Sequence, residues 1–249
     1  MKLEICAGSL TDAIAAVVGG ADRIELCSAL SEGGLTPSAG TICSAVRLPL
    51  PVNVLIRPRN GDFIYCESEA DLMEMDVRQA LHNGASGIVV GALTPEGYVD
   101  QPLCRRLIEA ALDENPEADL TFHRAFDVTV SPFEALDMIV DLGFRRVLTS
   151  GQASTALKGA PLIDKLKRHA AGRILIMAGA GVSDYNVSDI IRISHADEIH
   201  ASARSRISSS MVTHHSDASM GEGDATDGSR LVTDPNKVKC IKTVIDLMS

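Results

Sequence analysis

Eight short apolar segments recur along this chain, and each is followed by a segment with the residue spacing of an amphipathic helix. The predicted strands are 2–7, 22–27, 51–57, 86–91, 118–123, 145–149, 173–178 and 196–201. The predicted helices are 11–18, 38–46, 70–83, 102–115, 132–142, 159–169, 187–194 and, at the end of the chain, 235–248. Eight strands that alternate with helices within 249 residues are typical of a (β/α)8 TIM barrel.

The alternative α/β architecture is an open, doubly wound sheet. That fold often places a Gly-x-Gly-x-x-Gly motif after the first strand, and no such motif follows residues 2–7. No change in composition marks a linker between domains. We therefore predict one TIM-barrel domain over residues 1–249.

One segment departs from the strand–helix alternation. Residues 203–234 are rich in Ser, Thr, Asp, Gly and Met, and they follow the eighth predicted strand. Loops of this length are typically active-site lids or mobile insertions. We predict a long mobile loop at the active face of the barrel, and leave both roles open.

Charge and composition exclude several classes of partner. The formal net charge is −10, only 3% of residues are aromatic and there is no Trp, so a nucleic-acid-binding surface is not expected. No signal peptide and no apolar run long enough to span a membrane are apparent. Six cysteines in such a chain predict reduced thiols and a cytoplasmic location.

Two predicted strands carry the same Glu-x-Cys pattern, in Leu3-Glu4-Ile5-Cys6 and Ile24-Glu25-Leu26-Cys27. Because side chains alternate between the faces of a strand, Glu and Cys share one face and the apolar residues share the other. The same test on the other strands predicts a polar barrel interior. Its expected members are Glu4, Cys6, Glu25, Cys27, Asn53, Arg57, Thr121, His123, Glu198 and His200.

The predicted interior contains more negative than positive charge. Three glutamates face one certain cation, Arg57. A bound metal ion, protonated histidines or a raised carboxylate pKa would each relieve this excess, so a metal site and an acid–base site are both consistent with it. Two neighbouring thiols favour a soft metal such as Cu(I) or Zn. Cys6 and Cys27 are alternatively small buried apolar residues, placed in different layers by the stagger of the barrel.

Glycine-rich turns follow the sixth and seventh predicted strands, at Thr149-Ser150-Gly151 and Ala178-Gly179-Ala180-Gly181. Backbone amides in such turns can hold a phosphate or carboxylate group, and late barrel loops frequently do so. Ser150, Gly151, Gly179 and Gly181 are the predicted contacts, although glycines also simply permit tight turns. Arg59 is a further candidate for holding an anion, or else fixes its loop through ion pairs.

Several longer motifs together resemble one family, the copper homeostasis protein CutC family. They are Gly20-Ala21-Asp22-Arg23-Ile24-Glu25-Leu26-Cys27, Gly33-Gly34-Leu35-Thr36-Pro37-Ser38, Ile56-Arg57-Pro58-Arg59-Asn60-Gly61-Asp62-Phe63 with Tyr65, Thr121-Phe122-His123-Arg124-Ala125-Phe126-Asp127, Leu148-Thr149-Ser150-Gly151, Met177-Ala178-Gly179-Ala180-Gly181 and Glu198-Ile199-His200-Ala201-Ser202. The resemblance extends from Met1 to about Ser202. It implies a TIM barrel, a cytoplasmic location, a homo-oligomer and a role in copper tolerance or Cu(I) binding, with Cys6 and Cys27 as candidate ligands.

Two functions follow from these observations. The first is a cytosolic copper homeostasis protein that binds Cu(I) through Cys6 and Cys27, with His123 or His200 as candidate additional ligands. We expect such a protein to be a homodimer or homotetramer, and to bind neither nucleic acid nor membranes.

The alternative is a TIM-barrel enzyme of lyase or isomerase type that acts on a small anionic metabolite. In that enzyme, Glu4 and Glu25 would exchange protons, and Arg57 and Arg59 would hold the anionic group. His123 or His200 would polarise the substrate. The sequence specifies neither the substrate nor the reaction.

Overall fold

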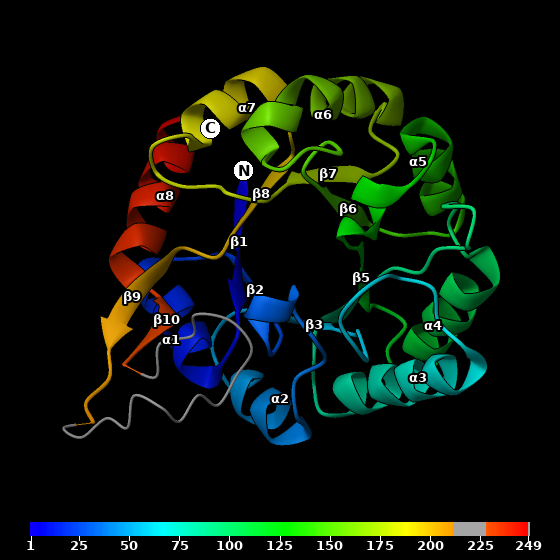
Figure 1. Cartoon of the computed structure of the whole chain (residues 1–249), viewed down its shortest axis with the longest axis horizontal. Helices are drawn as coiled ribbons and strands as arrows, with labels where there is room; N and C mark the ends of the chain where they lie inside the picture. The colour runs from blue at the N-terminus through cyan, green and yellow to red at the C-terminus, as the bar shows by residue number, and fades with distance from the viewer. Residues whose placement is uncertain (212–227, 249) are drawn as a thin grey trace.

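A computed structural model, which describes residues 1–211 and 228–248, contains a closed barrel of eight parallel strands (Figure 1). The strands are β1 (Lys2–Ala7), β2 (Arg23–Leu26), β3 (Val52–Leu55), β4 (Gly87–Val90), β5 (Asp119–Phe122), β6 (Arg146–Thr149), β7 (Leu175–Ala178) and β8 (Glu198–Ala201). Each strand pairs with its neighbours in sequence, and β8 pairs with β1 to close the barrel. The predicted TIM barrel is confirmed.

Helices surround the barrel on its outside (Figure 1). They are α1 (Leu10–Gly19), α2 (Ala39–Ala45), α3 (Glu67–His82), α4 (Gln101–Glu114), α5 (Pro132–Asp141), α6 (Ala156–Ala170), α7 (Val187–Ser194) and α8 (Pro235–Met248), with short 3-10 helices at η1 (Leu30–Glu32) and η2 (Arg124–Val128). None of the helices in the described part of the chain is long and apolar enough to span a membrane.

Local signals account for where several helices begin. The Ser9 hydroxyl accepts a hydrogen bond from the Asp12 amide at the start of α1, as a helix N-cap should. Thr155 caps α6 in the same way, so that helix begins at Ala156, three residues before the predicted start.

The hydrophobic core lies between the strands and the helices. Leu3, Ile5, Ile24 and Leu26 point outward from the barrel into this layer and have no exposed surface. The alternation of the two Glu-x-Cys strands is therefore confirmed, because the intervening Glu and Cys side chains point into the barrel. Apolar burial of this kind is the main favourable term in the free energy of folding.

The barrel stagger sets which inward residues lie side by side. In the β1–β2 pair, Cys6 lies opposite Glu25 rather than opposite Cys27, and Glu4 lies opposite Arg23. In the β1–β8 pair, Glu4 lies opposite His200. The register thus brings residues almost 200 positions apart into one layer of the interior.

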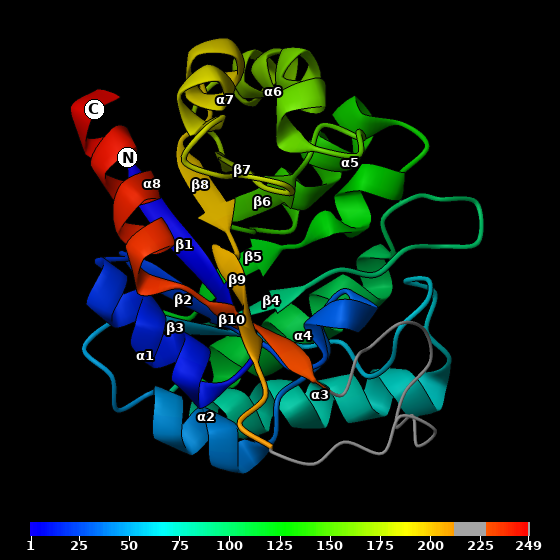
Figure 2. The same cartoon turned by 60° about the vertical axis from the view of Figure 1, so that its left-hand side comes forward.

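The segment predicted as one long loop begins and ends in regular structure. β9 (Arg204–Ser208) and β10 (Ser229–Thr233) form an antiparallel pair beyond β8 (Figures 1 and 2). The Thr233 amide donates to Asp12 of α1 over 2.8 Å, which fixes the pair against the barrel. Within the predicted loop 203–234, residues 204–208 and 229–233 are strands instead of loop, and residues 212–227 lie outside the described part of the chain.

Candidate functional site

A cavity of about 410 Å³ opens at the carboxyl end of the barrel strands. Glu25, Arg57, His123 and His200 line it, as does Cys6. These side chains come from β1, β2, β8 and the segments that follow β3 and β5. The carboxyl end is the face on which TIM barrels carry their active sites.

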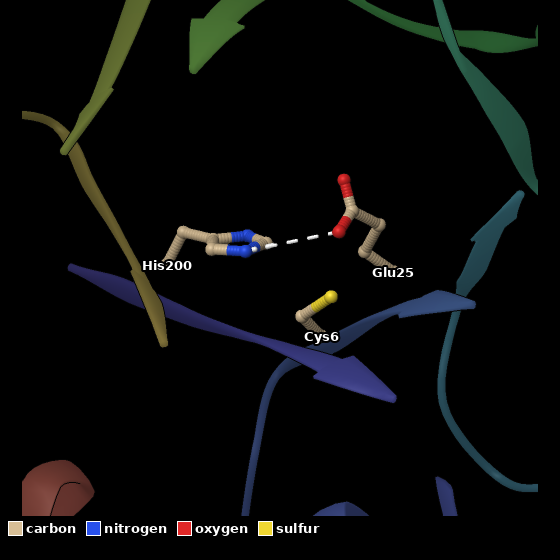
Figure 3. Close-up of side chains that lie close together, drawn as sticks. All are labelled: Cys6, Glu25 and His200. Atoms are coloured by element: carbon tan, nitrogen blue, oxygen red, sulfur yellow. Dashed lines mark ion pairs between the residues drawn. The ribbon is translucent and has the colours of Figure 1, made fainter. Parts of the chain in front are cut away.

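The sulfur of Cys6 and the polar side-chain atoms of Glu25 and His200 form a tight group on the wall of this cavity (Figure 3). One ligand atom from each residue lies within 4.8 Å of the other two. All three residues are more than four-fifths buried, so the group has the composition and geometry of a small metal or acid–base centre.

His200 lies between two carboxylates. Its Nδ1 is 2.8 Å from Glu4 Oε1, and its Nε2 is 3.7 Å from Glu25 Oε2. Burial alone would lower the pKa of His200, but Glu25, Cys6 and Glu4 outweigh burial and raise this pKa well above its ordinary value. Burial also raises the pKa of Glu25, against the opposing effect of His200. We therefore describe His200 as an imidazolium shared by two glutamates.

The two candidate metal ligands are in contact although they are not paired in register. Cys6 Sγ and Cys27 Sγ are 3.6 Å apart, and both thiols are free. Cys6 faces the cavity, whereas Cys27 is fully buried behind it, where its thiol donates to the Ala7 carbonyl over 3.5 Å. The hydrogen bond with Cys27, followed by burial, raises the pKa of Cys6 well above its ordinary value.

An ion cluster fills the barrel beneath the cavity, and sequence reasoning missed its two cations. Arg23 contacts Glu4 and Glu198, each over 2.5 Å. Arg146 contacts Glu198 over 2.9 Å and Asp119 over 2.7 Å. The expectation that Arg57 is the one cation facing the interior glutamates is therefore wrong.

Alternation would have found Arg23, which lies two residues before Glu25 on the same strand face. Both cluster arginines sit at the first position of their strands, where a charge is easily assigned to the preceding turn. With Arg23 and Arg146 counted, the interior has no large excess of negative charge that requires a metal ion.

Arg57 lines the cavity, but most of its donors are used by the protein. Its Nη1 donates to the carbonyls of Glu32 and Gly34, and its Nη2 donates to Gly61. The guanidinium stacks on Phe63 with its carbon 5.0 Å from the ring centroid. Its Nε is buried and has no hydrogen-bond partner among the described residues.

Arg59 lies outside the cavity. It contacts Glu69 over 2.6 Å and Asp62 over 3.0 Å, and it packs over the ring of Tyr65. These contacts match the alternative interpretation of Arg59 as a residue that fixes its loop.

His123 follows β5 and is buried against the cavity. Its Nδ1 accepts a hydrogen bond from the Ala125 amide over 3.1 Å, and its Nε2 has no partner among the described residues. Burial, assisted by the charge of Arg57, lowers the pKa of His123 to about 3. The ring is therefore a neutral imidazole at physiological pH, with its proton assigned to Nε2 by the Ala125 contact.

The glycine turn after β6 holds an anion that belongs to the protein itself. Asp127 accepts hydrogen bonds from the Ser150 amide and hydroxyl, at 3.0 and 2.9 Å, and from the Thr149 hydroxyl at 2.5 Å. The Gln152 amide adds a fourth contact over 3.2 Å. Ser150 and Gly151 do not line the cavity, so the structure does not place them where a bound ligand would touch them.

The turn after β7 behaves differently. Gly181 lines the cavity, whereas Gly179 packs against Leu148 and His200 and donates its amide to Thr149. Two further cations, Arg124 and Arg204, also line the cavity. Arg124 directly follows the predicted strand 118–123, whereas Arg204 falls within the predicted loop 203–234 and carries no signal of its own.

Comparisons with known proteins agree with this architecture. The sequence model of the CutC family matches residues 1–205. The copper homeostasis protein cutC homolog of Homo sapiens is 45% identical over 244 residues, which cover 97% of this chain and 88% of the human protein. A family protein CutC of Parabacteroides distasonis is 45% identical over 240 residues, which cover 95% of this chain and 97% of that protein.

A crystal structure of CutC from Streptococcus agalactiae matches with a TM-score of 0.74 and 33% identity, over 81% of this chain and 99% of that chain. The matched family region includes every barrel strand and the Cys6, Glu25, His200 group. This chain therefore belongs to the CutC family.

Proposed function

We propose that this protein acts in copper homeostasis by binding Cu(I) through the thiolates of Cys6 and Cys27. The observation that carries the proposal is the 3.6 Å separation of the two sulfurs, of which Cys6 lines the inner wall of an open cavity and Cys27 lies behind it. Soft thiolate ligands select Cu(I) over hard cations. The names of the human and mouse relatives, both copper homeostasis protein cutC homologs, support the same role.

Cys6 is shared by the sulfur pair and by the Cys6, Glu25, His200 group, which does not include Cys27. Sulfurs 3.6 Å apart would both be within reach of one ion, given metal–sulfur bonds of ~2.3 Å. Glu25, or His200 once a bound ion has displaced one of its ring protons, would be the candidates for a third ligand, because each offers a ligand atom within 4.8 Å of Cys6 Sγ. Cys6 would be the first sulfur that an entering ion meets, because Cys27 lies behind it.

Both ligands must remain reduced for this role. Two free thiols 3.6 Å apart can be oxidised to a disulfide, and a reducing compartment keeps such pairs as thiols. We propose the cytoplasm as that compartment.

Anaerobic competition against a chromophoric Cu(I) chelator tests the proposal. Reduced protein should remove one Cu(I) per chain from the chelator, and the Cys6→Ser/Cys27→Ser variant should remove almost none. X-ray absorption at the copper edge should report sulfur ligands in the wild-type complex only.

The chain offers a matched control in two exposed thiols, Cys66 and Cys240. The Cys66→Ser/Cys240→Ser variant loses the same number of sulfurs but should bind Cu(I) as the wild type does. Equal affinity of the wild type and the Cys6→Ser/Cys27→Ser variant would refute the thiolate site.

A second candidate function is acid–base catalysis on a small anionic metabolite, of lyase or isomerase type. The observation that favours it is the placement of His200 between Glu4 and Glu25, at the wall of a cavity on the catalytic face of the fold. Such an enzyme requires that the cavity also bind an organic anion.

A further inference from the structure

Positive charge is concentrated around the cavity although the whole chain is acidic. Arg57, Arg124 and Arg204 line the cavity, and among the described residues Glu25 is the one carboxylate on its wall. The formal net charge of the chain is −10, so this cluster opposes the overall field of the protein. A concave site lined by one sign of charge attracts ligands of the opposite sign.

Two buried N–H donors beside the cavity have no acceptor among the residues that the structure describes. His123 Nε2 and Arg57 Nε lack hydrogen-bond partners within the described residues, and these residues are only 5% and 6% exposed. Both groups flank the Phe63 ring, with the His123 ring centroid and the Arg57 guanidinium carbon each 5.0 Å from its centroid. Buried donors without acceptors are rare in native proteins, because each is unfavourable when left unpaired.

The orientation of His123 makes it a donor rather than an acceptor. Because the Ala125 amide donates to Nδ1, the neutral ring carries its proton on Nε2. The free position therefore suits an oxygen atom with a lone pair, as in a carboxylate or phosphate group.

The outer part of the cavity offers more donors. The guanidinium of Arg204 has no hydrogen bond or ion pair to any residue in the described ranges, and Arg124 uses Nε and Nη2 but not Nη1. The amides of Gly181 and Val182, which also line the cavity, likewise donate to no described acceptor. Gly181 has a φ of +66°, a backbone conformation found where successive amides converge on an anion.

We propose that this cavity binds a small organic oxyanion, a metabolite bearing a carboxylate or a phosphate group. Arg57 and His123 form its inner wall, where each enclosed Nε–H reaches a ligand oxygen once the neighbouring side chains shift. Arg204, Arg124 and the Gly181–Val182 amides hold the anionic group nearer to solvent. A cavity of about 410 Å³ has the size of a metabolite site. The inference does not depend on copper, and it supplies the ligand class that the second candidate function requires.

Ligand titrations of metal-free, reduced full-length protein test the site. The probes are inorganic phosphate, glycerol phosphate and malonate, each compared with potassium chloride at equal ionic strength. At least one probe should raise the melting temperature in a saturable way and shift the NMR signal of the His123 Nε2–H group. A response to the phosphates alone or to malonate alone supports the site and identifies the anionic group.

Arg204→Gln is the informative variant, because the lost guanidinium forms no hydrogen bond or ion pair with any residue of the described ranges. It should weaken probe binding about tenfold or more, the equivalent of one charge-assisted hydrogen bond. Arg145→Gln is the matched control, since Arg145 is 66% exposed and does not line the cavity. His123→Phe removes the buried donor and keeps the ring, and should also weaken binding.

Copper binding and oxyanion binding can fail separately. The Cys6→Ser/Cys27→Ser variant should still bind the probe, whatever its affinity for Cu(I). The proposal would be overturned if none of the three probes gave a saturable effect beyond that of chloride. It would also be overturned if Arg204→Gln bound the probe as tightly as Arg145→Gln does.

Discussion

At the scale of single residues, the ion pairs of a buried charge decide whether that charge stabilises or destabilises the folded barrel. Glu4 has no exposed surface, and it accepts hydrogen bonds from Arg23 over 2.5 Å and from His200 over 2.8 Å. Burial would raise the pKa of Glu4, but Arg23 and His200 outweigh burial and lower this pKa to about 2. Glu4 therefore stabilises the fold as a carboxylate, and it would leave two cations poorly compensated if it were removed.

The first prediction concerns Glu4→Gln and its dependence on pH. At neutral pH the variant should unfold about 3–5 kcal/mol more easily, the usual cost of breaking a buried ion pair. The folded pKa of Glu4 lies below its unfolded value of 4.5, so its contribution is fully present above about pH 4.5 and is lost as pH falls towards 2. The difference in the free energy of unfolding between wild type and variant should therefore decrease as the pH falls from about 4.5 towards 2. Urea unfolding at each pH measures this difference.

Glu117→Gln is the control, since Glu117 is exposed and forms no ion pair with any described residue. Its stability should follow that of the wild type at every pH. A gap for Glu4→Gln that stayed constant from pH 6 to the acid limit would contradict this account of Glu4.

Residue-level prediction succeeded where an apolar neighbour revealed the strand face. Glu4, Cys6, Glu25 and Cys27 could be placed inside the barrel because Leu or Ile stands between them. The roles of Ser150 and Gly151 could not, because the Asp127 carboxylate that occupies the turn is more than 20 residues away in sequence. Nothing in the turn itself shows that its donors are already used.

At the scale of elements, one close backbone approach joins the β6–α6 turn to the first part of α6. A Cβ atom built on Gly159 would lie 1.8 Å from the Ser150 carbonyl oxygen, and one built on Gly151 would lie 2.3 Å from the Gly159 carbonyl oxygen. The two glycines thus let the turn lie directly on the helix. Gly40, within α2, contrasts with them because a Cβ there would meet only the Ser38 hydroxyl, at 4.0 Å.

The second prediction uses this contrast. Gly159→Ala should lower the free energy of unfolding by about 2–3 kcal/mol or more, because the added methyl group meets backbone that cannot move freely. Gly40→Ala should raise it by about 0.5–1 kcal/mol, because alanine is the better residue in an exposed helix position. Chemical denaturation of both variants measures the two signs, and a tolerated Gly159→Ala would show that α6 can shift away from the turn.

Element-level prediction was accurate for the barrel and poor beyond it. Short apolar segments alternating with helical spacing gave the order of all eight β/α units, because both patterns are local. The strands at 204–208 and 229–233 were missed, because their sequences are polar and partly exposed. Their pairing depends on each other and on the contact from Thr233 to Asp12, which no local pattern reveals.

At the scale of the whole molecule, closure of the barrel between β1 and β8 creates the site. It places His200 beside Glu4 and Glu25, and it brings Cys6 to the same cavity wall as Glu25 and His200. Closure also brings α8 against α1 and β1, on the outer side of the same strand (Figure 2). The set of side chains that line the cavity therefore depends on the closed barrel, and no single β/α unit supplies it.

The third prediction concerns assembly, which the sequence suggested only through the family resemblance. We expect a homodimer or homotetramer in solution. Light scattering after size-exclusion chromatography should give a mass of two or four times the 26.4 kDa of one chain. A mass of one chain across the micromolar range would contradict this expectation.

The sequence by itself determined the (β/α)8 fold, the inward face of its first strands and membership of a recognisable family, because these depend on local spacing and on long motifs. Only the tertiary structure decided how the inward groups are used. Barrel stagger and closure pair Glu4 with Arg23 and His200 and bring Cys6 against Cys27. Among the described residues, they also leave one donor each of His123 and Arg57 unpaired beside the cavity. Pairing of buried charges and donors depends on distances between strands, and a linear pattern of residues does not contain those distances.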